Sequence, residues 1–216
     1  APGPLTGTVA PTGGRYTVVT KGALTGAITT SNSGGKWGAE LKFAGYDLLI
    51  IEGKAKNLVY LVINDDDVQI LPAKGLWGKT VWQTEPWIHA QHGNDQMKIA
   101  SIGIAGEYGC KFACIVNDLH RAAGRSGVGT VMASKNLKAV SVRGTKGVGG
   151  IKDPARFMSA IAEAKQVLAD NEVTGVGLPT FGTQVLMNVI NEVGAMPTRN
   201  MREVQFEGAH KISAEA

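Results

Sequence analysis

A stretch rich in arginine and glycine, NDLHRAAGRSGVG at residues 117–129, constrains this chain more than any other. Arg121 and Arg125 stand four residues apart, so a helical turn would place both on one face. The glycines of the stretch let the backbone approach a ligand closely. Guanidinium groups match the geometry of phosphate oxygens, and the N–H groups of a glycine-rich bend form an anion-binding nest. The stretch predicts a site for a phosphorylated or polyanionic ligand, with a tight turn and solvated arginines as the alternative.

Composition narrows the class of protein. The 216 residues suffice for one large domain, or for one domain and part of a second. A hydrophobic content of 44% and a charged content of 19% are typical of a folded chain. The net charge of +4 suits anionic ligands but lacks the clustered Lys and Arg of nucleic-acid binders. No apolar run approaches the roughly 18 residues of a membrane span. We expect no nucleic-acid partner and no membrane span.

The cysteines and histidines do not predict a metal centre. Cys110 and Cys114 are too few for a disulfide framework, which favours a reducing compartment and predicts a cytoplasmic protein. Without a second pair they do not form a closed zinc or iron–sulfur site, so we expect small buried cysteines. His89 and His92 stand three apart with no third ligand nearby, and we expect them at the surface.

Residue patterns predict several elements of secondary structure. Apolar and β-branched runs predict strands over residues 16–20, 48–52 and 59–63, the last two joined as a hairpin. Thr84, followed by Pro86, predicts the start of a helix that ends near residue 92.

A flexible connection is predicted at residues 144–150, GTKGVGG. A strongly helical pattern follows, capped by Asp153 and reaching about residue 169. We expect a β-rich domain over residues 1–149 and the beginning of a helical domain over residues 150–216. The chain opens without Met and closes on HKISAEA, so we expect a segment of a longer polypeptide that lacks the N-terminal part of its first domain.

Several motifs occur in an order that is far more specific than any single glycine pattern. They are GPLTGT, PTGGRYTVVTK, LTGAITTSNSGG, ELKFAGYDLLIIEGKA, NDLHRAAGRSGVG and SKNLKAVSVRG. In this order they resemble the tungsten-containing aldehyde ferredoxin oxidoreductase family from residue 3 to about residue 144. A weaker resemblance continues through LPTFGT and residues 188–194.

The resemblance implies an α+β fold. Its β-rich N-terminal domain of two sheets forms the base for a tungsten bis-pyranopterin cofactor (tungstopterin), and the beginning of a helical domain follows. Molybdenum in place of tungsten stays open, and a magnesium ion bridges the cofactor phosphates. Asn32 and Ala122 match the positions whose backbone carbonyls reach the magnesium. The positions that match the cofactor-lining residues are Arg15, Asn32, Ser33, Gly34, Arg121, Ala122, Gly124 and Arg125.

The resemblance also implies a reaction. It is the oxidation of aldehydes to carboxylic acids, or the reverse reduction, with electrons passing through a [4Fe–4S] cluster. The acceptor is ferredoxin or an iron–sulfur partner subunit, in an oligomer or complex. The family's cluster ligands and substrate-contacting residues lie in later domains, so no catalytic acid or base is predicted in this chain. His120, beside Arg121, is expected to be structural.

Two alternatives remain. One is a tungsten-dependent relative that acts on another substrate, such as an aromatic thioester. The other is a nucleotide-binding module, suggested by Gly127-Val128-Gly129 before a predicted helix. The dinucleotide fingerprint needs a third glycine where Met132 stands, which weakens that alternative.

Overall fold

A computed structural model describes residues 1–216, and the chain divides into two compact units, Ala1–Lys152 and Asp153–Ala216. In the first unit, a small sheet contains β1 (Tyr16–Lys21) and β2 (Ile28–Ser33). The large sheet contains β3 (Val59–Asn64), β4 (Asp67–Pro72), β5 (Lys98–Ser101), β6 (Ile115–Asn117), β7 (Arg121–Ala123) and β8 (Leu137–Arg143). The helices of this unit are α1 (Trp37–Phe43), α2 (Val81–His92), α3 (Ile104–Glu107) and α4 (Val128–Ser134).

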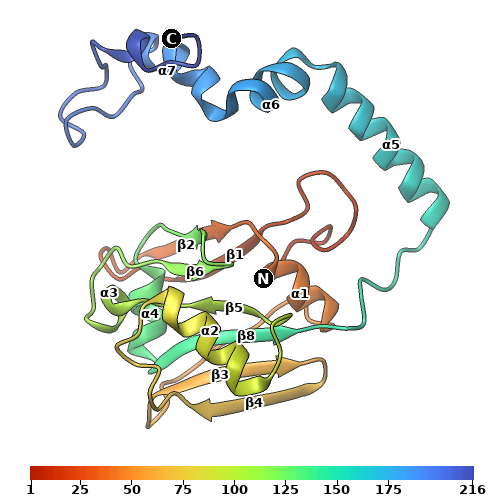
Figure 1. Ribbon diagram of the computed structural model, residues 1–216, viewed down its shortest axis with the longest axis vertical. Coiled ribbons are helices and arrows are strands. Elements are labelled where there is room, and N and C mark those ends of the chain that lie inside the picture. The colour runs from red at the N-terminus through yellow and green to blue at the C-terminus, as the bar shows by residue number, and fades with distance from the viewer. The chain divides into compact units, whose positions relative to one another are not determined.

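The large sheet has the strand order β4-β3-β8-β5-β6-β7 (Figure 1). Only β3 and β8 run parallel; every other neighbouring pair is antiparallel. β7 is therefore an edge strand. The predicted α+β class with two sheets is confirmed.

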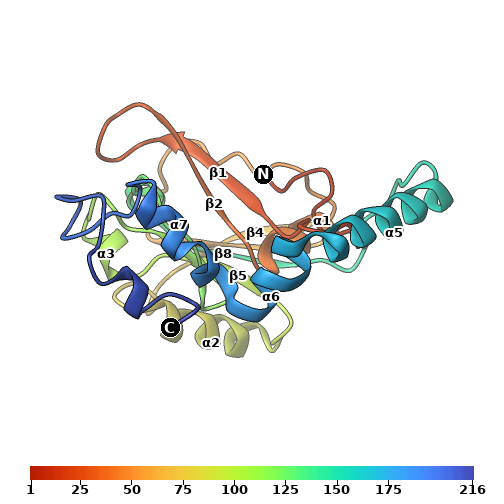
Figure 2. The ribbon, with the colours of Figure 1, turned by 90° about the horizontal axis from the view of Figure 1, so that it is seen from above.

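Strand alternation places apolar side chains on both faces of the large sheet. In β3, Leu61 and Ile63 join a core with α1, α4 and β1, whereas Tyr60 and Val62 join a second core with α2. Alternate residues of a strand point to opposite faces, which explains the division. Figure 2 shows the small sheet on one side of the large sheet and α2 on the other. The core thus fixes β1 and β2 above the large sheet.

Helix α2 begins earlier than the sequence predicts. Thr80 is its N-cap, and its hydroxyl accepts from the Gln83 N–H while the Gln83 side chain accepts from the Thr80 N–H. This reciprocal capping box satisfies two donors that a helix start leaves free. Thr84, the predicted cap, is buried in the first turn, and Pro86 lies inside the helix. The end at His92, followed by Gly93 in the left-handed conformation, is as predicted.

The strand predicted at residues 48–52 is not formed. Leu48 and Ile50 are mostly exposed, and the segment pairs with no other strand. The hairpin instead joins β3 to β4 across Asp65 and Asp66. An apolar run alone does not specify a strand, because ladder formation needs a neighbour in register.

The second unit is helical. Its elements are α5 (Pro154–Asp170), the π-helix η1 (Glu172–Gly177), α6 (Leu178–Phe181), the 3₁₀-helix η2 (Gly182–Leu186), α7 (Met187–Glu192) and the 3₁₀-helix η3 (Ala209–Lys211). Asp153 caps α5, as predicted, by accepting from the Arg156 N–H at 3.0 Å.

One stretch of the second unit, Glu172–Glu192, has the length and mean hydropathy (1.2) of a membrane-spanning helix. The stretch meets this test by length and average composition only, and its polar residues interrupt any continuous apolar run. The stretch combines π, α and 3₁₀ geometry, and Gly182 interrupts it with a φ of +63°. A hydrocarbon core penalises such irregular backbone, so the stretch is weak support for a span.

Candidate functional site

The predicted site residues gather where β2 meets β7. An open hollow of about 500 Å³ lies there. Its lining contains Asn32, Ala122, Gly124 and Arg125 of the predicted set, together with Thr30 and Ser31. Ser31 is buried, and its hydroxyl accepts from the Arg125 N–H at 3.0 Å. This hydrogen bond joins the small sheet to the loop that follows β7.

The backbone of Asn32 is directed toward the free edge of β2. Asn32 pairs with Thr17 of β1, but the Thr17 N–H and carbonyl are both bonded to Ala1 on the other side of β1. In an antiparallel pair, facing residues exchange both hydrogen bonds or none. The Asn32 N–H and carbonyl therefore point away from β1, and the carbonyl is available to a ligand at this edge.

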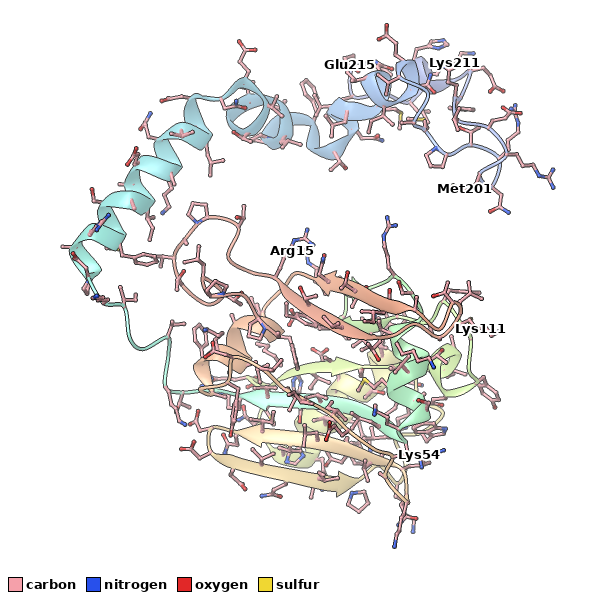
Figure 3. The ribbon with its side chains drawn as sticks, turned by 180° about the vertical axis from the view of Figure 1, so that it is seen from behind. Arg15, Lys54, Lys111, Met201, Lys211 and Glu215 are labelled. Carbon is pink, nitrogen blue, oxygen red and sulfur yellow. The ribbon has the colours of Figure 1, made fainter.

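Three arginines at or near the hollow have no carboxylate partner, and Arg125 is the one that lines it. Arg15 donates to the Asn32 side-chain oxygen at 3.2 Å, and none of Arg15, Arg121 and Arg125 forms an ion pair within residues 1–216. All three are exposed. Figure 3 shows the Arg15 side chain directed away from the large sheet. The free positive charge suits a polyanionic ligand.

The helical turn that was predicted to place Arg121 and Arg125 on one face is not formed. Arg121 lies on β7, and Arg125 follows the strand in a loop. Arg125 borders the hollow, whereas the stem of Arg121 packs beside Gly35, with its Cγ 3.1 Å from where a Cβ of Gly35 would lie. The antiparallel pairing of β7 with β6, in which Arg121 faces Asn117, favours the strand over the helix.

The glycines around the site fall into two groups. A Cβ on Gly127 or Gly129 would lie within 2.3 Å of a backbone carbonyl oxygen, so close packing of the chain requires both glycines. A Cβ on Gly34 or Gly124 would meet no atom within 4 Å, and neither has a positive φ. Nothing in the chain itself requires glycine at these two positions. Close approach of a bound ligand supplies a reason.

Ser33 and Gly34 lie beside the hollow. Ser33 is buried, and its hydroxyl donates to the side-chain oxygen of Asn117 at 2.7 Å. The Gly34 carbonyl accepts from the Asn117 amide at 2.9 Å. Asn117, fully buried at the end of β6, was not among the predicted site residues. The sequence signals for it were its place at the start of the motif NDLHRAAGRSGVG and its position at the end of an apolar run.

Burial affects one titratable group near the site. Burial raises the pKa of Tyr16 above its ordinary range, although the hydrogen bond with Ser33 acts against the shift. The Tyr16 hydroxyl donates to the Asn117 side-chain oxygen at 3.0 Å. Tyr16 is therefore a neutral donor, buried beside Asn117, at physiological pH.

The remaining chemistry-bearing side chains form no metal centre. No group of three or more His, Cys, Asp or Glu side chains in residues 1–216 is placed to hold a metal ion. His89 contacts the Met97 carbonyl and His92 contacts the Tyr60 hydroxyl, both as half-buried residues. Cys110 and Cys114 are free and only half-buried, so the expectation of full burial was wrong. A cation at the hollow would need backbone carbonyls and ligand oxygens.

The arrangement is suited to binding phosphate groups. It combines unpaired guanidiniums, open backbone at two glycines and a free carbonyl edge. The backbone N–H groups of Gly34, Gly35 and Gly124 donate to no acceptor in the chain, so they remain available to an anion. The residues present fit a phosphorylated cofactor with a magnesium ion.

Two models of one protein family match this chain. Residues 1–144 match the model of the aldehyde ferredoxin oxidoreductase N-terminal domain, and residues 159–216 match the model of domains 2 and 3 of the same family.

Curated relatives include tungsten-containing aldehyde ferredoxin oxidoreductases. That of Pyrococcus furiosus is 54% identical over 216 residues, and that of Thermococcus kodakarensis is 55% identical over 215 residues. Both alignments cover 100% of this chain, and 36% and 35% of the respective relatives. The chain thus spans about a third of the length of these relatives.

More distant relatives have other names. The WOR-like subunit of an aliphatic sulfonate oxidoreductase from Pyrococcus furiosus is 35% identical over 176 residues, covering 74% of this chain and 27% of the relative. Among solved structures, the active-site complex BamBC of benzoyl coenzyme A reductase, in complex with 1,5-dienoyl-CoA, superposes with a TM-score of 0.80. Its identity is 33%, and the match covers 98% of this chain and 34% of that chain.

Proposed function

This chain belongs to the aldehyde ferredoxin oxidoreductase family, and from that premise we propose that residues 1–152 form the base for a tungsten bis-pyranopterin cofactor. The whole protein is proposed to oxidise aldehydes to carboxylic acids, or to catalyse the reverse reduction. The observation that carries the proposal is the hollow between β2 and β7. There Asn32, Ala122, Gly124 and Arg125 meet beside guanidiniums without a carboxylate partner.

The proposed binding groups act on the cofactor phosphates. Arg121 and Arg125 offset the phosphate charge and donate in the bidentate manner of guanidinium. Arg15 acts with Asn32, to which it is already hydrogen-bonded. Gly34 and Gly124 leave room for the ligand beside the backbone. Ser33 supports this wall from the buried side through Asn117.

We propose that the Asn32 and Ala122 carbonyls would hold magnesium, with phosphate and water as its other ligands. The Asn32 carbonyl points to the free edge of β2, which supports this role. Hard carbonyl oxygen is a suitable ligand for magnesium. Molybdenum remains an alternative to tungsten, because these residues bind phosphate rather than the redox metal.

When bound, the metal–pterin group would supply the two-electron redox chemistry. This chain's residues bind and orient that group. The electrons are proposed to reach ferredoxin or an iron–sulfur partner subunit through a [4Fe–4S] cluster whose ligands lie outside residues 1–216. We propose an oligomer or complex in the cytoplasm, where the free thiols Cys110 and Cys114 would stay reduced.

A second candidate is a family member with another substrate. The likeness to the benzoyl coenzyme A reductase complex and to the sulfonate oxidoreductase subunit supports it, because the same cofactor base would serve several reactions. The higher identity to the aldehyde enzymes favours the aldehyde proposal.

The nucleotide-binding alternative is not supported by the topology. A dinucleotide-binding unit needs two parallel strands joined by a helix. β7 and β8 flank α4 in sequence, but β8 pairs with β3 and β5 rather than with β7. The Gly127-Val128-Gly129 motif instead packs closely against residues 111–114.

The test is cofactor content of the full-length protein purified from its own host. We expect tungsten, two pterins and magnesium in the wild type. The double variant Arg121→Ala, Arg125→Ala should lower the tungsten, pterin and magnesium contents by about tenfold or more, since each substitution removes charge-assisted hydrogen bonds. Arg156→Ala, an exposed arginine without an ion pair on α5, is the matched control and should load normally. Normal pterin content in the double variant would refute the assigned roles.

The metal content of the purified protein does not by itself identify the reaction. For the loaded wild type we expect aldehydes to reduce an oxidised low-potential electron acceptor. We expect an aromatic thioester not to oxidise the reduced form of that acceptor. Oxidation of the reduced acceptor by the thioester, without acceptor reduction by aldehydes, would favour the second candidate.

A further inference from the structure

Asn117 is a buried junction between the two sheets. Its side chain is 0% exposed. The side-chain oxygen accepts from the hydroxyls of Tyr16 at 3.0 Å and Ser33 at 2.7 Å. The amide nitrogen donates to the Gly34 carbonyl and to the Asp118 carboxylate, both at 2.9 Å. Both lone pairs and both N–H groups are used, so the amide has one possible orientation.

The bond to Gly34 fixes a peptide plane. In a planar trans peptide the carbonyl and the following N–H point in opposite directions. Since the Gly34 carbonyl points toward Asn117, the Gly35 N–H points away from it. That N–H donates to no acceptor in the chain. Asn117 thereby directs a free donor away from the buried junction.

Asp118 connects the other side of the junction. Its carboxylate accepts from the Lys36 N–H at 2.5 Å, while its backbone begins the turn between β6 and β7 with a φ of +48°. A Cβ on Gly35 would lie 2.1 Å from this carboxylate. Asn117 and Asp118 thus hold residues 34–36 against the turn that leads into Arg121.

We propose that Asn117 is a positioning residue that sets the spacing between the two phosphate-binding segments, residues 32–35 and 121–125. The inference rests on the proposed function, because the ligand of both segments is the phosphorylated cofactor. Asn117 itself lies under the surface and binds no ligand. It acts through the peptide of Gly34 and Gly35 and through Asp118. A buried amide that only stabilised the fold would contribute to stability without a separate effect on ligand loading.

The test separates loading from stability by exchanging two side chains. Asn117→Asp keeps the acceptor for Tyr16 and Ser33 but removes both donors and faces the Asp118 carboxylate. Adding Asp118→Asn restores a donor–acceptor pair and the original net charge, yet the Gly34 carbonyl still has no donor. Asn117→Ser provides a third variant without the amide. Tyr16→Phe, which removes one hydrogen bond to Asn117 but keeps the amide, is the matched control.

Metal, magnesium and pterin contents of the full-length proteins are compared with their thermal unfolding midpoints. We expect every folded variant without the amide to hold about tenfold to a hundredfold less cofactor than an amide-retaining variant of the same midpoint, as for other residues that orient metal ligands. In particular, the double variant Asn117→Asp, Asp118→Asn should recover the thermal unfolding midpoint but not the cofactor content. Loading that follows the midpoint across all variants would overturn the inference.

Hydrogen exchange distinguishes failure of the inference from failure of the proposed function. A wild type without pterin would overturn the proposed function. The junction is then judged on the amide of Lys36, which donates to Asp118. We expect Asn117→Asp to speed exchange at this amide more than Tyr16→Phe does. Equal exchange in the two variants would overturn the positioning role.

Discussion

Lys138 on β8 is ion-paired with Glu107 on α3, and the two side chains are 0% and 2% exposed. Lys138 also donates to the Lys79 carbonyl at 2.7 Å, and Glu107 accepts from the Gly78 N–H at 2.8 Å. Burial lowers the pKa of Lys138, while the hydrogen bond to Glu107 opposes this shift. The pair connects the sheet, α3 and the turn before α2 on the side that carries no cofactor residue.

Removing one partner of this pair should be strongly destabilising. Lys138→Met leaves the Glu107 charge buried without compensation, so we expect the free energy of unfolding to fall by about 3–5 kcal/mol. Lys138→Met combined with Glu107→Leu should recover much of that loss. Denaturant unfolding of the purified protein measures both values. A loss below about 1 kcal/mol for the single variant would contradict the burial of the pair.

Glycines near the hollow should respond in opposite ways to alanine. Gly124→Ala should leave the fold intact, since its Cβ meets no atom within 4 Å, but should weaken cofactor binding by about 1–3 kcal/mol through overpacking. Gly129→Ala would place a Cβ 2.3 Å from the Cys114 carbonyl oxygen and should cost about 3 kcal/mol or more of folding stability. Thermal midpoints and pterin content distinguish the two effects. Full loading of a Gly124→Ala protein would argue against a ligand at that position.

The cap of α2 gives a local stability test. Thr80→Ala removes the capping box and should lower the free energy of unfolding by about 0.5–2 kcal/mol. Gln83→Ala removes only the reciprocal bond to the Thr80 N–H and should have a smaller effect. Denaturant midpoints of the two variants provide the comparison. Equal losses would show that the Thr80 hydroxyl contributes nothing beyond its partner.

Acid should weaken the link between the β3–β4 turn and the end of β8. Both carboxylate oxygens of Asp65 accept from Thr145, at 2.8 Å and 2.6 Å, and these bonds lower the pKa of Asp65 below its ordinary value of 3.8. The stabilisation is therefore present above pH 3.8 and is lost as pH falls through the lower folded-state pKa. Hydrogen exchange at the Thr145 amide should show protection that declines only below pH 3.8.

Two variants check the assignment to Asp65. Asp65→Asn should reduce protection of Thr145 at pH 5 and remove its acid dependence. Asp66→Asn, which affects the surface pair with Lys146, should change neither. An unchanged acid dependence in Asp65→Asn would assign the effect to another group.

The sequence patterns predict much of the local structure. β1, β3 and the end of α2 at His92 follow from side-chain alternation and a terminal glycine. The family resemblance selected residues that line a common hollow, Asn32 and Arg125 among them. These features depend on neighbours within a few residues along the chain or on a linear motif.

Other features were missed because hydrogen-bond partners, rather than residue types alone, decide them. The run at residues 48–52 has the composition of a strand but no pairing partner. Arg121 and Arg125 have helical spacing, yet Arg121 pairs in β7 with Asn117. Thr84 has the chemistry of a cap, but Thr80 takes that role because Gln83 completes its box.

The sequence alone determined the family, the α+β class and most of the residues that border the hollow. Only the tertiary structure decided that Asn117 meets Ser33, 84 positions earlier, and that the Asn32 carbonyl points to a free edge. The physical reason is that one hydrogen-bonding side chain has many possible partners. Burial between two packed sheets leaves only the partners that satisfy every donor and acceptor.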